Sequence, residues 1–148
     1  MIKLAQSIIH EFTRNLAMAP IDFEGDGFCH LLVNDQLMIN LKCDEENQRL
    51  TLIAEIKASL PESLSQAQVH TLLSHSLTMM HSHGPSLGWD AELGLIGFTH
   101  LPMSTLSLAN FEITLADFLD WLNANPITLE PTYTPANEHL LMQQNLKV

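Results

Sequence analysis

SQAQVHTLLSHSLTMMHSH, residues 65–83, is a stretch whose pattern predicts one capped amphipathic helix. Ser65 and Gln68 have the spacing of an S-x-x-Q capping box, in which each side chain bonds a backbone amide of the first turn. Gly84 and Pro85 end the helix, because glycine tolerates left-handed backbone angles and proline cannot continue a helix. Apolar side chains recur at helical spacing along the stretch: Val69, Leu72, Leu73, Leu77 and Met80. We therefore expect this helix to bury one face.

Short strands bounded by turn residues lie on both sides of this helix. Alternating and apolar runs predict strands at residues 28–33, 36–43 and 49–56 before it, and at 86–90 and 93–101 after it. Stripes at i, i+3, i+4 and i+7 predict two further helices at residues 2–18 and 108–123. The order α-β-β-β-α-β-β-α indicates an α+β fold, in which three helices accompany a largely antiparallel five-stranded sheet.

The chain of 148 residues is long enough for one domain with its own core. The helices and strands named above fall within residues 1–124, which we expect to form the domain. Pro126, Pro131 and Pro135 follow within ten residues, so we expect residues 125–148 to form an extended tail.

Composition excludes several classes of partner. Six Lys and Arg against 17 Asp and Glu give a net charge of −11, which disfavours nucleic acid because phosphate backbones are repelled. No segment approaches the roughly 20 apolar residues that a membrane span needs, and we expect no stable membrane insertion. Cys29 and Cys43 form no C-x-x-C pair, which favours two free buried thiols and a reducing cytoplasm. These features indicate an acidic cytoplasmic protein.

Several predicted strands carry large apolar residues on both faces. Leu31 and Val33 alternate with Leu32, for example, whereas a sheet with one covered face should alternate apolar and polar side chains. The second face is then covered by a helix, buried by a second subunit or left for a partner.

Eight histidines raise the question of a metal site. His70 and His75 are five residues apart, which differs from the i, i+4 spacing of an H-E-x-x-H site, and no carboxylate completes them. His81 and His83 suit a solvated helix C-terminus, where the helix dipole favours a positive ring. Signatures of nucleophilic catalysis and glycine-rich phosphate loops are absent from the sequence. We therefore predict no catalytic residue, no cofactor and no metal; a histidine-dependent metalloprotein is the remote alternative.

Together with the N-terminal amphipathic helix that ends before Pro20, four segments resemble the class I chaperones of bacterial type III secretion, the Tir-chaperone family. They are FCHLLVNDQLMINL, LTLIAEIKASLP, GPSLGWDAELGLIGFTHLP at residues 84–102, and the helix LANFEITLADFLDWL. The resemblance implies a homodimer that binds the N-terminal chaperone-binding segment of one or more effectors in extended form. Such a chaperone prevents aggregation and keeps its effectors competent for secretion, without ATP, in the bacterial cytoplasm. The secretion ATPase is a further candidate partner.

The resemblance also implies two sets of site residues. The dimer interface would contain Val69, Leu72, Leu73, Leu77, Met80, Leu87 and Trp89. The effector would contact Ile8, Phe12, Leu16, Phe28, Leu32, Met38, Ile53 and Phe98. A non-secretory adaptor or regulatory binding module of the same fold is the alternative function.

Overall fold

The computed structural model describes residues 1–56, 64–82 and 84–124, with side chains omitted for residues 78–82. In these residues the element order is the predicted one, with a short 3₁₀ turn (Met103–Thr105) before the last helix. The helices are α1 (Ile2–Asn15), α2 (Gln66–Ser82) and α3 (Leu108–Ala124). The strands are β1 (Phe28–Val33), β2 (Leu37–Asp44), β3 (Arg49–Glu55), β4 (Ser86–Asp90) and β5 (Gly94–Pro102). The predicted tail, residues 125–148, lies outside the described residues.

The five strands form one antiparallel sheet in the order β1-β2-β3-β5-β4. Its first hairpin turns at Asn34 and Asp35, which have φ values of 52° and 56°. Two successive positive φ angles are the mark of a type I′ turn, whose twist matches that of the flanking strands. The amide of Gln36 closes the turn on the Val33 carbonyl at 3.2 Å. This turn fixes the register of β1 against β2.

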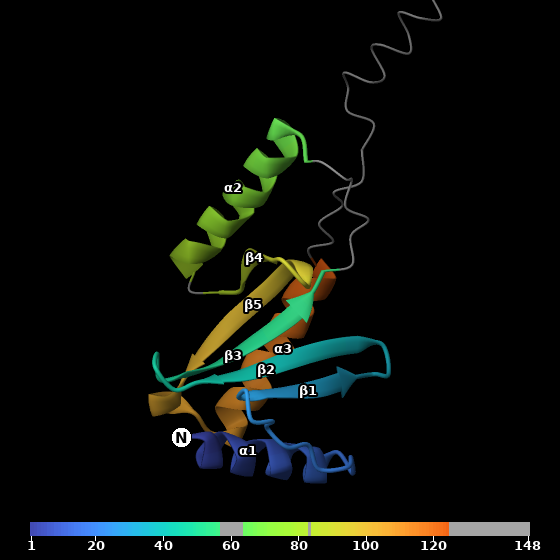
Figure 1. Cartoon of the computed structure of the whole chain (residues 1–148), viewed down its shortest axis with the longest axis vertical. Coiled ribbons are helices and arrows are strands. Elements are labelled where there is room, and N and C mark those ends of the chain that lie inside the picture. The colour runs from blue at the N-terminus through green and yellow to red at the C-terminus, as the bar shows by residue number, and fades with distance from the viewer. Residues whose placement is uncertain (57–63, 83, 125–148) are drawn as a thin grey trace, which may run out of the picture.

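Helices α1 and α3 cover one face of the sheet (Figure 1). Alternate residues of the three strands nearest α1 supply the core beneath them: Cys29, Leu31, Ile39, Leu41, Cys43, Leu50, Leu52 and Ala54. Phe12 of α1 meets Phe111 of α3 edge to face, with ring centroids 5.1 Å apart. Such pairs add to the stability that area burial provides. The core thus locks both helices to each other and to the sheet.

Helix α1 ends three residues earlier than the predicted residue 18. The amide of Met18 bonds the Thr13 carbonyl at 2.8 Å, and the amide of Ala17 bonds the Arg14 carbonyl at 3.0 Å. These two bonds make a Schellman motif, with Ala17 in its left-handed position at φ 54°. The helix therefore stops before Pro20, and the chain reverses into an extended connector, residues 18–24.

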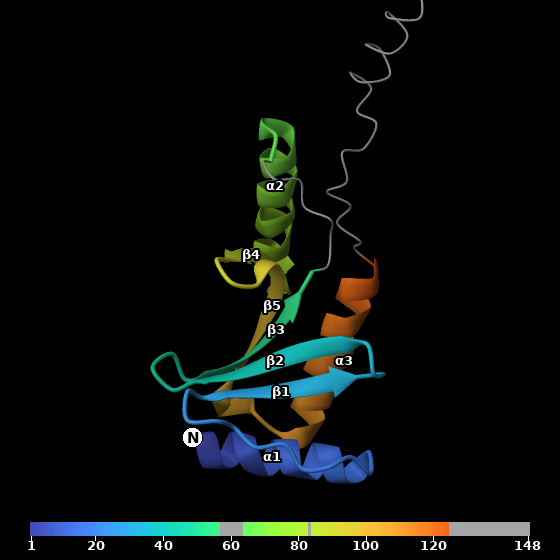
Figure 2. The same cartoon turned by 45° about the vertical axis from the view of Figure 1, so that its right-hand side comes forward.

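Helix α2 stands apart from the main core. Its predicted capping box is confirmed: the Ser65 amide donates to Gln68 Oε1 at 2.8 Å, and the Gln68 amide donates to Ser65 Oγ at 3.2 Å. Leu72 packs against a small cluster around Leu87 and Leu95. Both views show α2 projecting beyond the end of the sheet next to β4 (Figures 1 and 2). Much of its surface consequently faces away from its own subunit.

Candidate functional site

The sheet face opposite α1 and α3 is not covered by any helix of the described residues, and we call it the open face (Figure 1). Because paired residues of neighbouring strands share a face, the strand register defines its rows. Five of the residues predicted to bind an effector lie on it: Phe28, Leu32, Met38, Ile53 and Phe98. The sequence left three possibilities for this second face: a covering helix, a second subunit or a partner. The described residues supply no covering helix, so the second subunit and the partner remain.

The most exposed apolar part of the open face lies at the hairpin end of β1 and β2. Leu32 pairs with Met38, and their exposed fractions are 41% and 45%. Ile53 and Phe98, which pair across β3 and β5, are half-buried. Exposed apolar side chains gathered in this way mark interaction surfaces in soluble proteins.

Two polar side-chain pairs lie on the open face, in neighbouring rows. Nδ1 of His30 lies 2.7 Å from Oδ1 of Asn40, and Nδ1 of His100 lies 3.0 Å from Oγ1 of Thr51. Partial burial and the nearby Arg49 guanidinium lower the pKa of His100 below its ordinary value of 6.5. His100 is accordingly neutral at pH 7 and adds no charge of its own to its row of the face.

The described part of the open face carries two cations, which differ in their partners. Arg49 Nε donates to Asp44 Oδ2 at 3.2 Å. Lys42 forms no ion pair within the described part of the chain; its ammonium instead lies 5.3 Å from the ring centroid of Phe28. The ring quadrupole holds the ammonium there by a cation–π interaction.

Strand β1 is one of the two edge strands of the sheet, and β4 is the other. The Cys43 amide bonds the Gly27 carbonyl at 2.9 Å, which makes Cys29, Leu31 and Val33 the residues whose peptide groups face β2. The peptide groups of His30 and Leu32 therefore point away from the sheet, at an edge onto which an extended peptide can add.

Along α1 the predicted effector residues divide into two groups. Ile8 and Phe12 pack in the core, with exposed fractions of 6% and 8%, so they offer little surface to a partner. Leu16, at the end of the helix, is 56% exposed. Position on an apolar helical stripe thus did not separate core residues from surface residues.

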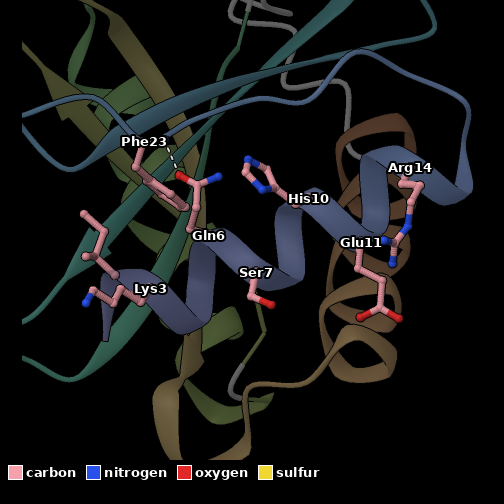
Figure 3. A pocket seen from close by; sticks show the side chains of 8 residues that line it. Lys3, Gln6, Ser7, His10, Glu11, Arg14 and Phe23 are labelled. Atoms are coloured by element: carbon pink, nitrogen blue, oxygen red, sulfur yellow. Dashed lines mark hydrogen bonds between the residues drawn. The ribbon is translucent and has the colours of Figure 1, made fainter.

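The outer side of α1 forms a polar groove of about 550 Å³ with the connector, residues 18–24 (Figure 3). Nε2 of Gln6 donates to the Ile21 carbonyl and Oε1 accepts from the Phe23 amide, both at 2.8 Å. His10 Nε2 lies 2.7 Å from Asp22 Oδ1. These side-chain bonds hold the connector against α1. Nothing in the spacing of the sequence indicated them.

The predicted dimer residues form a second exposed apolar surface, on α2 and β4. The exposed fractions are 37% for Val69, 63% for Leu73, 56% for Leu77 and 63% for Trp89. Leu72 and Leu87 face inward instead, in the small cluster beside β5. The side chain of Met80 lies outside the described residues.

No group of three His, Cys, Asp or Glu side chains capable of holding a metal occurs among the described residues. His70 is exposed and His75 half-buried on α2, whereas the side chains of His81 and His83 lie outside the described part. Both cysteines are buried, and burial raises the pKa of Cys29 to about 12. Its thiol is therefore protonated and unreactive at neutral pH.

Comparison with known protein families gives a match over most of the chain. Residues 7–124 match the model of the Tir chaperone protein (CesT) family. No curated protein matches the chain. None of the helices in the described residues is long and apolar enough to cross a membrane.

The fold is shared with chains of several solved complexes. A chain of the HopA1–SchA chaperone–effector complex is 26% identical, with a TM-score of 0.70 over 83% of this chain and 93% of that one. A chain of the ExsC–ExsE complex is 22% identical, with a TM-score of 0.76 over 90% and 98%. A chain of the ExoU–SpcU complex from Pseudomonas aeruginosa is 12% identical, with a TM-score of 0.60 over 86% and 98%.

Proposed function

The chain belongs to the Tir chaperone protein (CesT) family, and we propose that it is a type III secretion chaperone that binds the N-terminal segment of effector proteins in extended form. The observation that carries the proposal is the open face, which presents Leu32 and Met38 to solvent on a rigid five-stranded scaffold. A folded protein that leaves such a surface uncovered has a partner for it. Binding there would shield apolar effector segments and so prevent their aggregation.

The free edge of β1 supports binding of the client in extended form. The peptide groups of His30 and Leu32 offer hydrogen bonds to a client strand, and these bonds supply affinity independent of client sequence. Alternate client side chains would then reach the open face beside Leu32 and Met38. We include Leu16, Phe28, Ile53 and Phe98 in the same client surface, while Ile8 and Phe12 support it from the core.

We propose that the exposed stripe of α2 forms a homodimer. Val69, Leu73 and Leu77 follow one another at a spacing of four residues, and Trp89 adds a large exposed aromatic side chain. A second copy of α2 and β4 would remove these side chains from water, which is favourable by about 25 cal/mol per Å² of apolar surface. We place Met80 and the inward-facing Leu72 and Leu87 at the same interface.

The remaining properties that we propose follow from the family. Binding through surfaces of this kind needs no catalytic residue, no cofactor and no ATP, since the free energy comes from burial of client apolar surface. We propose the bacterial cytoplasm as its location, where effectors await export, and the secretion ATPase as a further partner. The charge of −11 supports this role by keeping a protein with exposed apolar surfaces soluble without its client.

Co-expression with candidate effectors tests the proposed function. The chaperone should co-purify with an effector, and light scattering should give the mass of two chaperone chains with the client. The rival is a non-secretory adaptor, which would bind a folded domain instead. Co-purification with a folded domain that survives deletion of the effector's N-terminal segment would favour the adaptor.

A further inference from the structure

The open face changes in character along its strands. The register places Lys42, Thr51 and His100 in one row, and Asn40, Ile53 and Phe98 in the next. A third row, at the hairpin end, holds Leu32 and Met38. The face therefore runs from a cationic end, through a polar and aromatic row, to an apolar end.

Lys42 is the feature of this surface that the proposed function has not used. It is exposed on a protein with a charge of −11, and its ammonium has no carboxylate partner among the described residues. The other cation of the face, Arg49, is already paired with Asp44. Phe28 belongs to β1, so contact with its ring holds the ammonium over that strand, beside the edge to which a client strand would add.

We propose that the open face selects client segments in which a carboxylate precedes or follows a run of alternating apolar side chains, with the carboxylate at the Lys42 ammonium. This inference rests on the proposed function and specifies the chemistry of the client. On the described part of the open face, Lys42 is the cation without a carboxylate partner, so a client carboxylate on this face is favoured at that position. A lysine there would meet repulsion from Lys42 instead.

The spacing of the client pattern follows from strand geometry. Lys42 and Met38 are four residues apart on β2, or roughly 13 Å at about 3.3 Å per residue. An extended client strand added beside β1 has the same rise, and side chains on one of its sides recur every two residues. The carboxylate should therefore stand four residues from a side chain that contacts Met38.

Synthetic peptides test this selectivity without an identified effector. The probes are fluorescein-labelled twelve-residue peptides of alternating valine and serine, in which the first valine is replaced by Asp, Asn or Lys. Binding to the full chain is measured by fluorescence polarisation at low salt. We expect the Asp peptide to bind about fivefold more tightly than the Lys peptide, the effect of one partly exposed ion pair.

Three variants separate the effect of Lys42 on peptide binding from the effect of net charge. Lys42→Glu should reverse the order of the Asp and Lys peptides, and Lys42→Gln should remove the advantage of the Asp peptide. Lys3→Glu changes the net charge by the same amount on α1 and should keep the wild-type order. An unchanged order with Lys42→Glu, or no binding of any peptide, overturns the inference. Co-purification of an effector would in either case leave the proposed function standing.

Discussion

Cζ3 of Trp121 on α3 stands 2.7 Å from the point that a Cβ on residue 97 would occupy, so Gly97 of β5 is what allows α3 to close on the sheet. Trp121 also packs against the cluster of Leu87 and Leu95 beside α2. The contact thus joins the main core to the region from which the proposed dimer helix projects.

Gly97→Ala should therefore destabilise the protein. The added methyl group would overlap the indole of Trp121, and overpacking of this kind costs about 1–3 kcal/mol. Urea denaturation followed by circular dichroism measures the change. Gly25→Ala is the matched control, because nothing lies within 4 Å of its added Cβ. Equal stability of the two variants would show that α3 does not pack on Gly97.

Ala17→Gly should stabilise the protein by about 0.5–1 kcal/mol. Ala17 adopts φ 54° in the Schellman motif that ends α1, a conformation that is unfavourable for a residue with a Cβ and natural for glycine. Thermal unfolding measures the gain. Ala116→Gly, on the exposed side of α3, should instead lose about 1 kcal/mol. Destabilisation by both variants to the same extent would contradict the left-handed assignment of Ala17.

Leu73→Asp should dissociate the proposed dimer while leaving each subunit folded. Leu73 is 63% exposed in one subunit, so a carboxylate there is harmless until a partner buries it, at a cost of several kcal/mol. Sizing with light scattering at micromolar concentration reports the mass. Ile113→Asp, which alters a 59% exposed residue on α3, serves as the control and should remain dimeric. A dimer that survives Leu73→Asp places the interface on another element.

Stability should fall between pH 6.5 and mildly acidic pH, partly through His100. Burial and Arg49 lower its pKa in the folded protein below 6.5, so the unfolded chain takes up the proton first as pH falls. Stability therefore decreases below pH 6.5 until the folded-state pKa is passed. His100→Gln should reduce the loss of melting temperature between pH 7 and pH 5.5. An identical loss of melting temperature in the variant would show that His100 does not contribute to the pH dependence of stability.

Two aspartates make the stability of the protein depend on pH in a second, lower pH range. Hydrogen bonds from Asn47 lower the pKa of Asp44, and backbone amides of Leu93 and Glu92 lower that of Asp90, each below 3.8. Their contribution is present above pH 3.8 and is lost as pH falls further. The His100 effect can therefore be measured separately above pH 5.

The elements themselves could be predicted from local chemistry. The strand bounds of β1 and β4 were predicted to the residue, and the capping box of Ser65 and Gln68 forms as expected. These features depend on turn residues, caps and periodicity, all of which are written within a few positions of one another.

Whether an apolar helical stripe is buried or exposed could not be predicted in the same way. Both α1 and α2 carry apolar residues at helical spacing, yet Phe12 is 8% exposed and Leu73 is 63% exposed. The difference arises because α1 lies against α3 and the sheet, whereas α2 projects past the end of the sheet. The position of each helix relative to the sheet depends on tertiary packing, which the local sequence pattern does not encode. The bonds of Gln6 to the connector, fifteen and seventeen residues away, are equally invisible to periodicity.

Limited proteolysis of a co-expressed complex tests the central claim, that the open face holds an effector segment in extended form. We expect protection of one N-terminal stretch of the effector. Met38→Asp should remove that protection with the melting temperature of the chaperone unchanged, because Met38 is 45% exposed. Ile113→Asp should retain it. Protection confined to a folded domain of the partner, or protection that persists fully with Met38→Asp, would contradict the claim.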